Sequence, residues 1–140
     1  MHRFYILLLT IMVFLIGCGD STSSTLTFTG ESNHWSAKCV QSATETWTKD
    51  SIGKLQYKTS GERKLTLYYK GTDVSKLRTI KYSYDTGVAG GSGEIDLNGR
   101  TSLVLDSSAG EDIPILHNDH IVDVSVEWNG MKENIRLTSK

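Results

Sequence analysis

Residues 117–120 (His-Asn-Asp-His) hold the side chains of this sequence best suited to binding a metal ion. Neutral imidazole and carboxylate oxygen are donors that zinc and copper accept, so His117, Asp119 and His120 form a candidate set. Histidines three residues apart share a face only on a helix, however, and this segment follows Pro114 and leads into a predicted strand. We therefore expect a solvated loop here, with no metal and no cofactor bound.

The glycine-rich residues 87–94 (GVAGGSGE) invite comparison with a phosphate-binding loop. Such a loop needs a helix N-terminus behind it and usually a Gly-Lys-Ser/Thr sequence, whereas Glu-Ile-Asp-Leu follows here and reads as a strand. The Gly-x-Ser-x-Gly pattern of a nucleophile elbow does not occur in the sequence. We expect residues 87–94 to be a mobile loop between strands, and we expect no catalytic residue and no enzyme activity.

Cys39 and a pair of tyrosines are the other candidates for chemistry or binding. Cys39 alternates with Trp35 and Ala37, which predicts a small core residue on a buried strand face and not a redox thiol. Tyr68 and Tyr69 are adjacent in a predicted strand, so their rings must point to opposite faces. An outward-facing tyrosine can stack on a sugar or contact a protein, so these two are the candidate binding residues.

Cys18 stands where an apolar run ends and a segment rich in serine and threonine begins. Residues 15–18 (Leu-Ile-Gly-Cys) resemble a bacterial lipobox. The resemblance implies that a diacylglycerol is attached to Cys18 through a thioether and that the chain is cleaved before it. Two or three acyl chains anchor a protein stably where one chain would not. We therefore expect Cys18 to be the lipidation site, through which the protein is attached to the membrane.

The residues before Cys18 have the layout of a secretory signal peptide, with Arg3 followed by the apolar residues 4–16. A helix of residues 4–17 would rise only about 21 Å, short of the roughly 30 Å hydrocarbon core of a bilayer. We expect residues 1–17 to be the lipoprotein signal peptide, residues 18–24 the lipidated cysteine with a polar tether, and residues 25–140 a single domain. These expectations place the domain on the extracytoplasmic face of the cell membrane.

Charge and cysteine content narrow the classes of partner. Without the signal peptide and its Arg3, fourteen cationic residues face sixteen acidic ones, a net charge of −2, and no basic run occurs. Nucleic acid is therefore not expected as a partner. With Cys18 acylated, Cys39 is the only thiol, so no disulfide within the chain is expected and the fold must rest on its core.

Apolar residues alternate with polar ones throughout the mature chain, in short runs bounded by glycine, serine or aspartate, which is typical of β-strands. The clearest case is residues 121–137, where Asn129-Gly130 predicts a two-residue type I′ turn. That turn sets Trp128 against Met131 and pairs Val124 with Ile135 and Val122 with Leu137 on one face. On the other face it pairs Glu127 with Lys132 and Asp123 with Arg136, and only Glu133, opposite Val126, breaks the pattern.

A second Asn-Gly pair, Asn98-Gly99, suggests a further hairpin. A three-residue loop would set Ile95 against Leu103, which suits a buried face better than the two-residue alternative. Seven or eight short strands with no helix predict an all-β fold, an antiparallel immunoglobulin-like β-sandwich. A small lipocalin-like β-barrel is the alternative, and it would need longer strands than the segment GEIDLNG offers.

Three segments, FTGESNHW, KYSYDTGVAGGSGEIDL and VSVEWNGMKENIRL, together resemble a group of small secreted lipoproteins of Bacillus and related Gram-positive bacteria. The likeness covers nearly the whole mature chain. It implies a membrane-anchored β-domain in a Gram-positive envelope, and it carries over no catalytic residue.

The expected function follows from the anchor and from the absence of recognisable site motifs in the sequence. We expect a non-catalytic binding or interaction module at the cell surface, with another envelope protein as its partner. The alternative is a carrier or sensor of a small ligand or a metal, which would use residues 117–120 or a barrel interior.

Overall fold

The computed structural model describes residues 19–140, so Cys18 and the expected signal peptide lie outside the described residues. The described chain is built from eight strands and one short 3-10 turn, η2 (Val74–Lys76). The strands are β1 (Asp20–Glu31), β2 (Trp35–Lys49), β3 (Leu55–Tyr69), β4 (Thr79–Asp85), β5 (Gly90–Asp96), β6 (Ser102–Glu111), β7 (Val122–Trp128) and β8 (Met131–Ser139).

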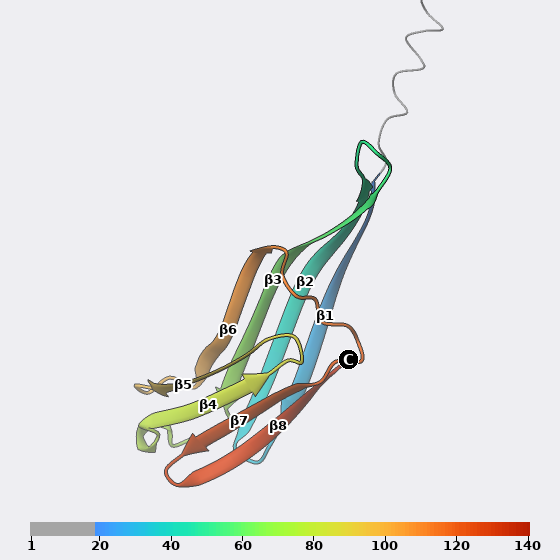
Figure 1. Cartoon of the computed structure of the whole chain (residues 1–140). Helices are drawn as coiled ribbons and strands as arrows, with labels where there is room; N and C mark the ends of the chain where they lie inside the picture. The colour runs from blue at the N-terminus through green and yellow to red at the C-terminus, as the bar shows by residue number, and fades with distance from the viewer. Residues whose placement is uncertain (1–18) are drawn as a thin grey trace, which may run out of the picture.

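All strand pairs are antiparallel, and the strands form a single eight-stranded sheet in the order β5-β4-β7-β8-β1-β2-β3-β6. The sheet folds over on itself, so that β4, β5, β7 and β8 form a layer across β1, β2, β3 and β6 (Figure 1). The predicted all-β antiparallel class is confirmed. Because one sheet bends through both layers, the barrel-like alternative describes the arrangement better than the two separate sheets of an immunoglobulin-like sandwich.

Strand length explains why the sequence favoured the sandwich. β2 and β3 are each 15 residues long. In β2 the alternation of apolar residues ends near Ala43, so the polar second half of the strand cannot be recognised from the sequence pattern. Long strands can twist and bend far enough to take part in a curved, nearly closed sheet. The polar half is held as a strand by pairing with both neighbours.

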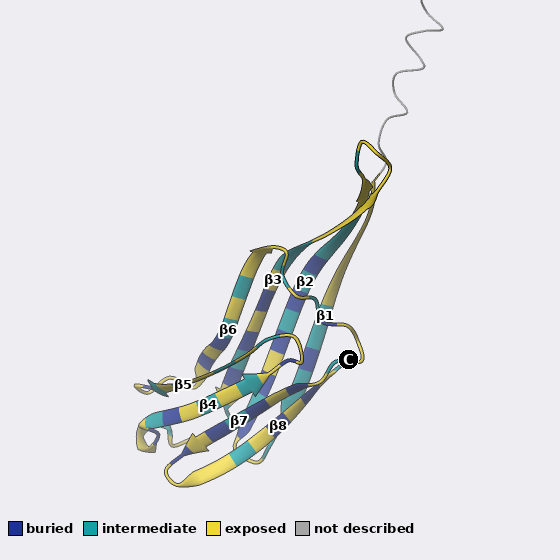
Figure 2. Ribbon diagram, viewed as in Figure 1, coloured by how far each residue is buried: buried dark blue, intermediate teal, exposed yellow. Residues whose placement is uncertain are grey.

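The core lies between the two layers and is built from alternate residues of most strands, as Figure 2 shows by the alternation of buried and exposed bands. One layer contributes Phe28, Trp35, Ala37, Cys39, Leu65, Leu67, Leu103 and Leu105, and the other contributes Ile80, Val122, Val124, Val126, Trp128, Ile135 and Leu137. Burial of Cys39 in this core confirms that it is a core residue.

The β7–β8 hairpin has the predicted register throughout. Trp128 pairs with Met131, Val124 with Ile135 and Val122 with Leu137, and both turn residues have positive φ, 48° at Asn129 and 76° at Gly130. On the outer face the two predicted ion pairs form, with nitrogen–oxygen distances of 2.9 Å for Lys132–Glu127 and 3.3 Å for Arg136–Asp123.

The predicted hairpin around Asn98-Gly99 is wrong. The turn itself forms, with φ of 50° at Asn98 and 78° at Gly99, but the strands that flank it do not pair with each other. β5 pairs with β4 and β6 pairs with β3, at opposite ends of the strand order, so this turn connects the two layers. A local turn signal determines the direction of the chain but does not determine which strand becomes the partner.

The glycine-rich residues 87–94 are mostly strand and not the expected loop, because β5 begins at Gly90. Gly91 pairs with Tyr84 and Gly93 with Tyr82, and each tyrosine ring lies directly over the glycine opposite it. A side chain at either glycine would fall within 3 Å of tyrosine ring or hydroxyl atoms. The glycines therefore leave room for rings, and the turn is confined to the four residues between β4 and β5.

Residues 20–24 of the expected tether lie in β1, where they pair with residues 43–47 of β2. Hydroxyl groups support this pairing, since Ser23 Oγ lies 2.8 Å from Thr44 Oγ1 and Thr25 Oγ1 lies 3.1 Å from Ser42 Oγ. Cross-strand pairs of this kind stabilise a sheet without any apolar residue.

Candidate binding surface

The first three strands continue beyond the rest of the fold as a three-stranded extension. β6 pairs with β3 only between Ser60 and Tyr68, and β8 pairs with β1 only at Phe28 and Thr29. The outer parts of β1, β2 and β3 therefore project past both neighbours, toward the upper end of Figure 1. In that region the sheet has two solvent-facing sides and two open edges.

The open edge of β1 carries an unused row of backbone hydrogen-bonding groups. The carbonyl of Thr27 faces away from β2, because it accepts a bond of 3.2 Å from the N–H of Lys140. Along an antiparallel strand the N–H and C=O of every second residue face the same side. The backbone groups of Thr25, Ser23 and Ser21 therefore face outward as well, and no described strand pairs with them on that side.

Edges of this kind are usually protected by charged residues, proline or a bulge, because they can pair with another chain. Residues 21–30 of β1 contain no charged residue and no proline, and their pairing with β2 has no irregularity. The edge of β1 is thus available for pairing with an added strand.

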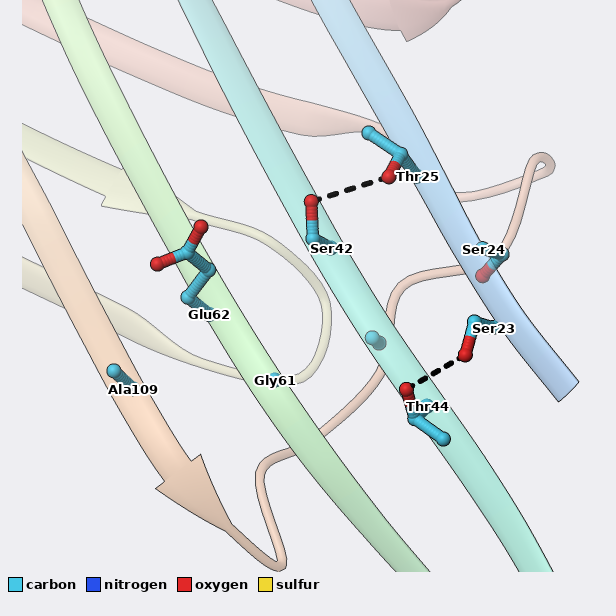
Figure 3. Close-up of a pocket in the computed structure, with 9 residues that line it drawn as sticks. Ser23, Ser24, Thr25, Ser42, Thr44, Gly61, Glu62 and Ala109 are labelled. Atoms are coloured by element: carbon cyan, nitrogen blue, oxygen red, sulfur yellow. Dashed lines mark hydrogen bonds between the residues drawn. The ribbon is translucent and has the colours of Figure 1, made fainter. Parts of the chain in front are cut away.

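Serine and threonine side chains cover the outer face beside this edge (Figure 3). A shallow depression on this face is lined by Ser23, Ser24, Thr25, Ser42, Ala43, Thr44, Gly61, Glu62 and Ala109. Ser23 and Thr25 point toward Thr44 and Ser42 respectively, and Glu62 provides the only charge of the lining. Hydroxyl groups donate and accept hydrogen bonds, so this face can contact the side chains of a polar, extended segment.

A buried polar network lies on the inner side, where the second layer ends. Arg63 is only 3% exposed, and its Nε donates to Asp106 Oδ2 at 3.1 Å while its Nη1 donates to the carbonyl of Pro114 at 3.3 Å. The hydroxyl of Tyr84 donates to Asp106 Oδ1 at 3.2 Å. Burial and the nearby Asp106 carboxylate raise the pKa of Tyr84. Every member of this network has a protein partner, which indicates a structural role.

The metal-ligand candidates lie in the segment between β6 and β7. The backbone N–H of His117 donates to Nδ1 of His120 at 2.9 Å, which occupies one of the nitrogens that a metal would need. The two imidazole rings are 5.6 Å apart, and Oδ1 of the exposed Asp119 is 3.5 Å from His120 Nδ1. Within residues 19–140, no three side chains of histidine, cysteine, aspartate or glutamate are grouped so as to hold a metal.

The same segment closes the inner face through Gln41. This buried amide donates from Nε2 to the carbonyl of Leu116 at 3.1 Å, and its Oε1 accepts from the N–H of Leu116 at 2.9 Å. Such a reciprocal pair imitates a strand contact and holds the irregular segment over β2.

The two tyrosine candidates separate as predicted. Tyr68 faces outward and is exposed, while Tyr69 packs inside with its ring centroid 5.0 Å from that of Trp35. Tyr68 lies near the end of β3 far from the extension, so the structure does not bring it together with the hydroxyl face.

Sequence reasoning missed a cluster of Ser32, His34 and Glu133. Glu133 Oε1 lies 2.5 Å from His34 Nδ1, and Glu133 Oε2 accepts from Ser32 Oγ at 2.5 Å and from the N–H of His34 at 3.0 Å. Burial opposes ionisation of Glu133, but the hydrogen bonds from His34 and Ser32 outweigh it and lower its pKa. The serine contacts the carboxylate and not the imidazole, so the three residues do not form a nucleophilic triad.

Comparison of the chain with protein-family models, with curated proteins and with solved structures finds no match. In the described part of the chain, no helix has the length and apolar character needed to cross a membrane.

Proposed function

We propose that this protein is a non-catalytic interaction module, anchored to the extracytoplasmic face of a Gram-positive cell membrane through acylated Cys18. We propose further that it binds an extended segment of another envelope protein by adding that segment to the edge of β1. The observation that carries the proposal is the unprotected row of outward-facing backbone groups at Ser21, Ser23 and Thr25.

Strand addition matches the chemistry of this surface. Main-chain hydrogen bonds to an open edge provide affinity, and the side chains beside the edge provide selectivity. Each hydrogen bond contributes a net of about 0.5–1.5 kcal/mol, so a few residues of added strand suffice for a reversible complex. The hydroxyl-bearing face around Ser42 and Thr44 would then select a segment with polar side chains on that side.

The anchoring part of the proposal is supported by the sequence. The cation, the apolar residues 4–16 and the Leu-Ile-Gly-Cys pattern precede the first described strand directly, and the resemblance to small Bacillus lipoproteins implies the same placement. The net charge of the mature chain favours a protein partner over nucleic acid.

Site-specific photo-crosslinking in cells tests the proposal. A benzoylphenylalanine at Ser23, on the edge strand, should crosslink to an envelope protein, and the same residue at the exposed Lys132 should not. Thr25→Pro removes an outward-facing N–H and leaves the N–H groups that face β2, so it should abolish the adduct. Thr25→Ala keeps that N–H and should retain the adduct, which makes it the matched control.

Mass spectrometry of the adduct identifies the partner. An adduct that persists in Thr25→Pro, or one formed only between two copies of this chain, would contradict binding of an envelope protein at this edge. Cys18→Ala should release the protein from the membrane fraction and reduce the adduct, and a variant that stays membrane-bound would contradict the anchor.

A further inference from the structure

The tip of the β2–β3 hairpin carries an unusual concentration of exposed apolar side chains. Trp47 is 42% exposed, Ile52 85%, Leu55 56% and Tyr57 45%, and they make up four of the nine exposed large hydrophobic residues of the described chain. Isolated surface hydrophobics are ordinary, but a cluster at one projecting end indicates a contact surface.

Cross-strand pairing organises the cluster. Trp47 pairs with Tyr57, their ring centroids are 4.4 Å apart, and the next pair on the same face of the ladder is Lys49 with Leu55. By strand alternation these side chains belong to the inner face of the sheet. The second layer does not extend over this end of the strands, where the ribbon is mostly exposed (Figure 2). The segment between β6 and β7 reaches only as far as Thr59, whose hydroxyl donates to the carbonyl of Ile113 at 2.9 Å. Beyond Thr59 the second layer therefore does not cover the apolar side chains of the tip.

The tip is also rich in lysine, with two acidic residues next to it, Asp20 beside Trp47 and Glu45 beside Tyr57. Residues 47–58 contain Lys49, Lys54 and Lys58 against the single acidic residue Asp50. The carboxylate of Asp50 is occupied by the turn itself, because Oδ1 accepts from the N–H groups of Ile52 at 3.0 Å and Lys54 at 2.8 Å. These bonds hold the turn in the shape that leaves Ile52 at its apex.

The N-terminus reaches the fold at this same tip. Asp20, the first residue of β1, pairs with Trp47, and Gly19 lies against Thr48. Between the α-carbons of Cys18 and Asp20 the chain can span at most about 7 Å. If Cys18 is acylated, its α-carbon lies within that distance of the strand, so the attached lipid keeps the tip close to the membrane surface.

We propose that the hairpin tip, residues 47–57, lies in the headgroup region of the bilayer, with Ile52 and Leu55 at the acyl boundary. This inference rests on the proposed acylation of Cys18. Tryptophan and tyrosine are enriched at membrane–water interfaces, and lysines near the surface are attracted to anionic lipid headgroups. Trp47 and Tyr57 with Lys49, Lys54 and Lys58 match both requirements. The lipid and the hairpin then form two attachments, which orient the domain with the β1 edge beside the membrane.

Quenching of tryptophan fluorescence by brominated lipids tests this placement on the full-length acylated protein in vesicles of phosphatidylcholine and phosphatidylglycerol. Trp35 and Trp128 are buried in the core, so quenching should come from Trp47. We expect strong quenching in the wild type and its loss in Trp47→Phe. We also expect acrylamide in the water phase to quench Trp47 less in vesicles than in the unacylated Cys18→Ala protein.

A second variant perturbs the tip and leaves Trp47 in place as the reporter. Ile52→Asp puts a charge at the exposed apex of the turn and should reduce lipid quenching of Trp47 while the acyl chains still hold the protein. Met131→Asp, at the exposed start of β8 and away from the tip, is the matched control and should leave the quenching unchanged.

Flotation of the vesicles separates this inference from the proposed anchor. A wild-type protein that does not float with the vesicles would overturn the acylation of Cys18. A protein that floats but shows no more lipid quenching than Trp47→Phe would overturn the placement of the tip alone, and the tip would then be free to bind a protein.

Discussion

Nδ1 of His34 lies 2.5 Å from Oε1 of Glu133, ninety-nine residues away in the sequence. His34 belongs to the turn between β1 and β2, and Glu133 lies on β8. The contact therefore links the end of β1 to β8, where the sheet bends from one layer to the other. The ladder between β1 and β8 has only two residue pairs. The contact therefore extends a short seam that holds both layers together.

Removal of the Glu133 carboxylate should weaken this seam. Glu133→Ala deletes an acceptor of three hydrogen bonds and should lower the free energy of unfolding by about 1.5–3 kcal/mol, the range for hydrogen bonds to a charged group. Urea titration followed by tryptophan fluorescence measures the change. Asp123→Ala, which removes an exposed ion pair on the same hairpin, should cost less than about 1 kcal/mol.

The same carboxylate should make stability depend on pH. Its pKa is lower in the folded protein than its ordinary value, so its charged form stabilises the fold. The stabilisation is complete above about pH 5, beyond the ordinary pKa of glutamate, and is lost as the pH falls through the lower folded value. The difference in unfolding free energy between wild type and Glu133→Gln should thus shrink between pH 6 and pH 3. A constant difference over that range would show that ionisation of Glu133 contributes nothing.

A side chain at Gly30 should force the two layers apart. A β-carbon there would collide with the backbone carbonyl oxygen of Arg136 and would lie 3.2 Å from Cγ2 of Ile135. Because the obstacle includes backbone, Gly30→Ala should destabilise the fold by about 1–3 kcal/mol. Gly99→Ala is the comparison, since it adds strain from positive φ with no atom within 4 Å, and it should cost less. Thermal unfolding of both variants shows which of the two substitutions destabilises the fold more.

Removal of the Asp106 side chain alone should lower the free energy of unfolding more than its removal together with the Arg63 charge. Asp106→Ala leaves a buried guanidinium without its carboxylate and should cost about 3–5 kcal/mol. The double variant Asp106→Ala with Arg63→Met also removes the unpaired guanidinium charge and should be more stable than Asp106→Ala. Chemical denaturation of the wild type, both single variants and the double variant measures the coupling. Additive losses would show that the two side chains act independently.

Cys39 should be unreactive until the protein unfolds. Burial raises the pKa of its thiol to about 11, so at pH 8 only about one thiol in a thousand is ionised, and reagents also have no access to it. In the Cys18→Ala chain Cys39 is the only thiol. Labelling by a maleimide should be absent in buffer and should appear along the urea unfolding curve. Fast labelling in buffer would show that the core opens locally at β2.

Local patterns were sufficient for much of the fold. Alternation predicted the core side of Trp35, Ala37 and Cys39, and a turn signal with matched faces predicted the entire register of the β7–β8 hairpin. Both depend on neighbours that are close in sequence, where the period of the strand and the geometry of the turn leave few alternatives. Even the exception was informative, because Glu133, the residue that did not fit its hairpin, binds His34 in a distant turn.

The order of residue types along the chain is enough to predict the all-β class, the core side of the strands and an anchor at Cys18. Three features became visible only in the folded chain: β5 and β6 lie at opposite ends of the sheet, the glycines at 91 and 93 lie under tyrosine rings, and residues 20–24 form a strand. Folding also brought Trp47 and Tyr57 to the end of the fold where β1 begins. These features depend on which distant strands pair, and that choice is made by the packing of the whole core, which no short segment encodes.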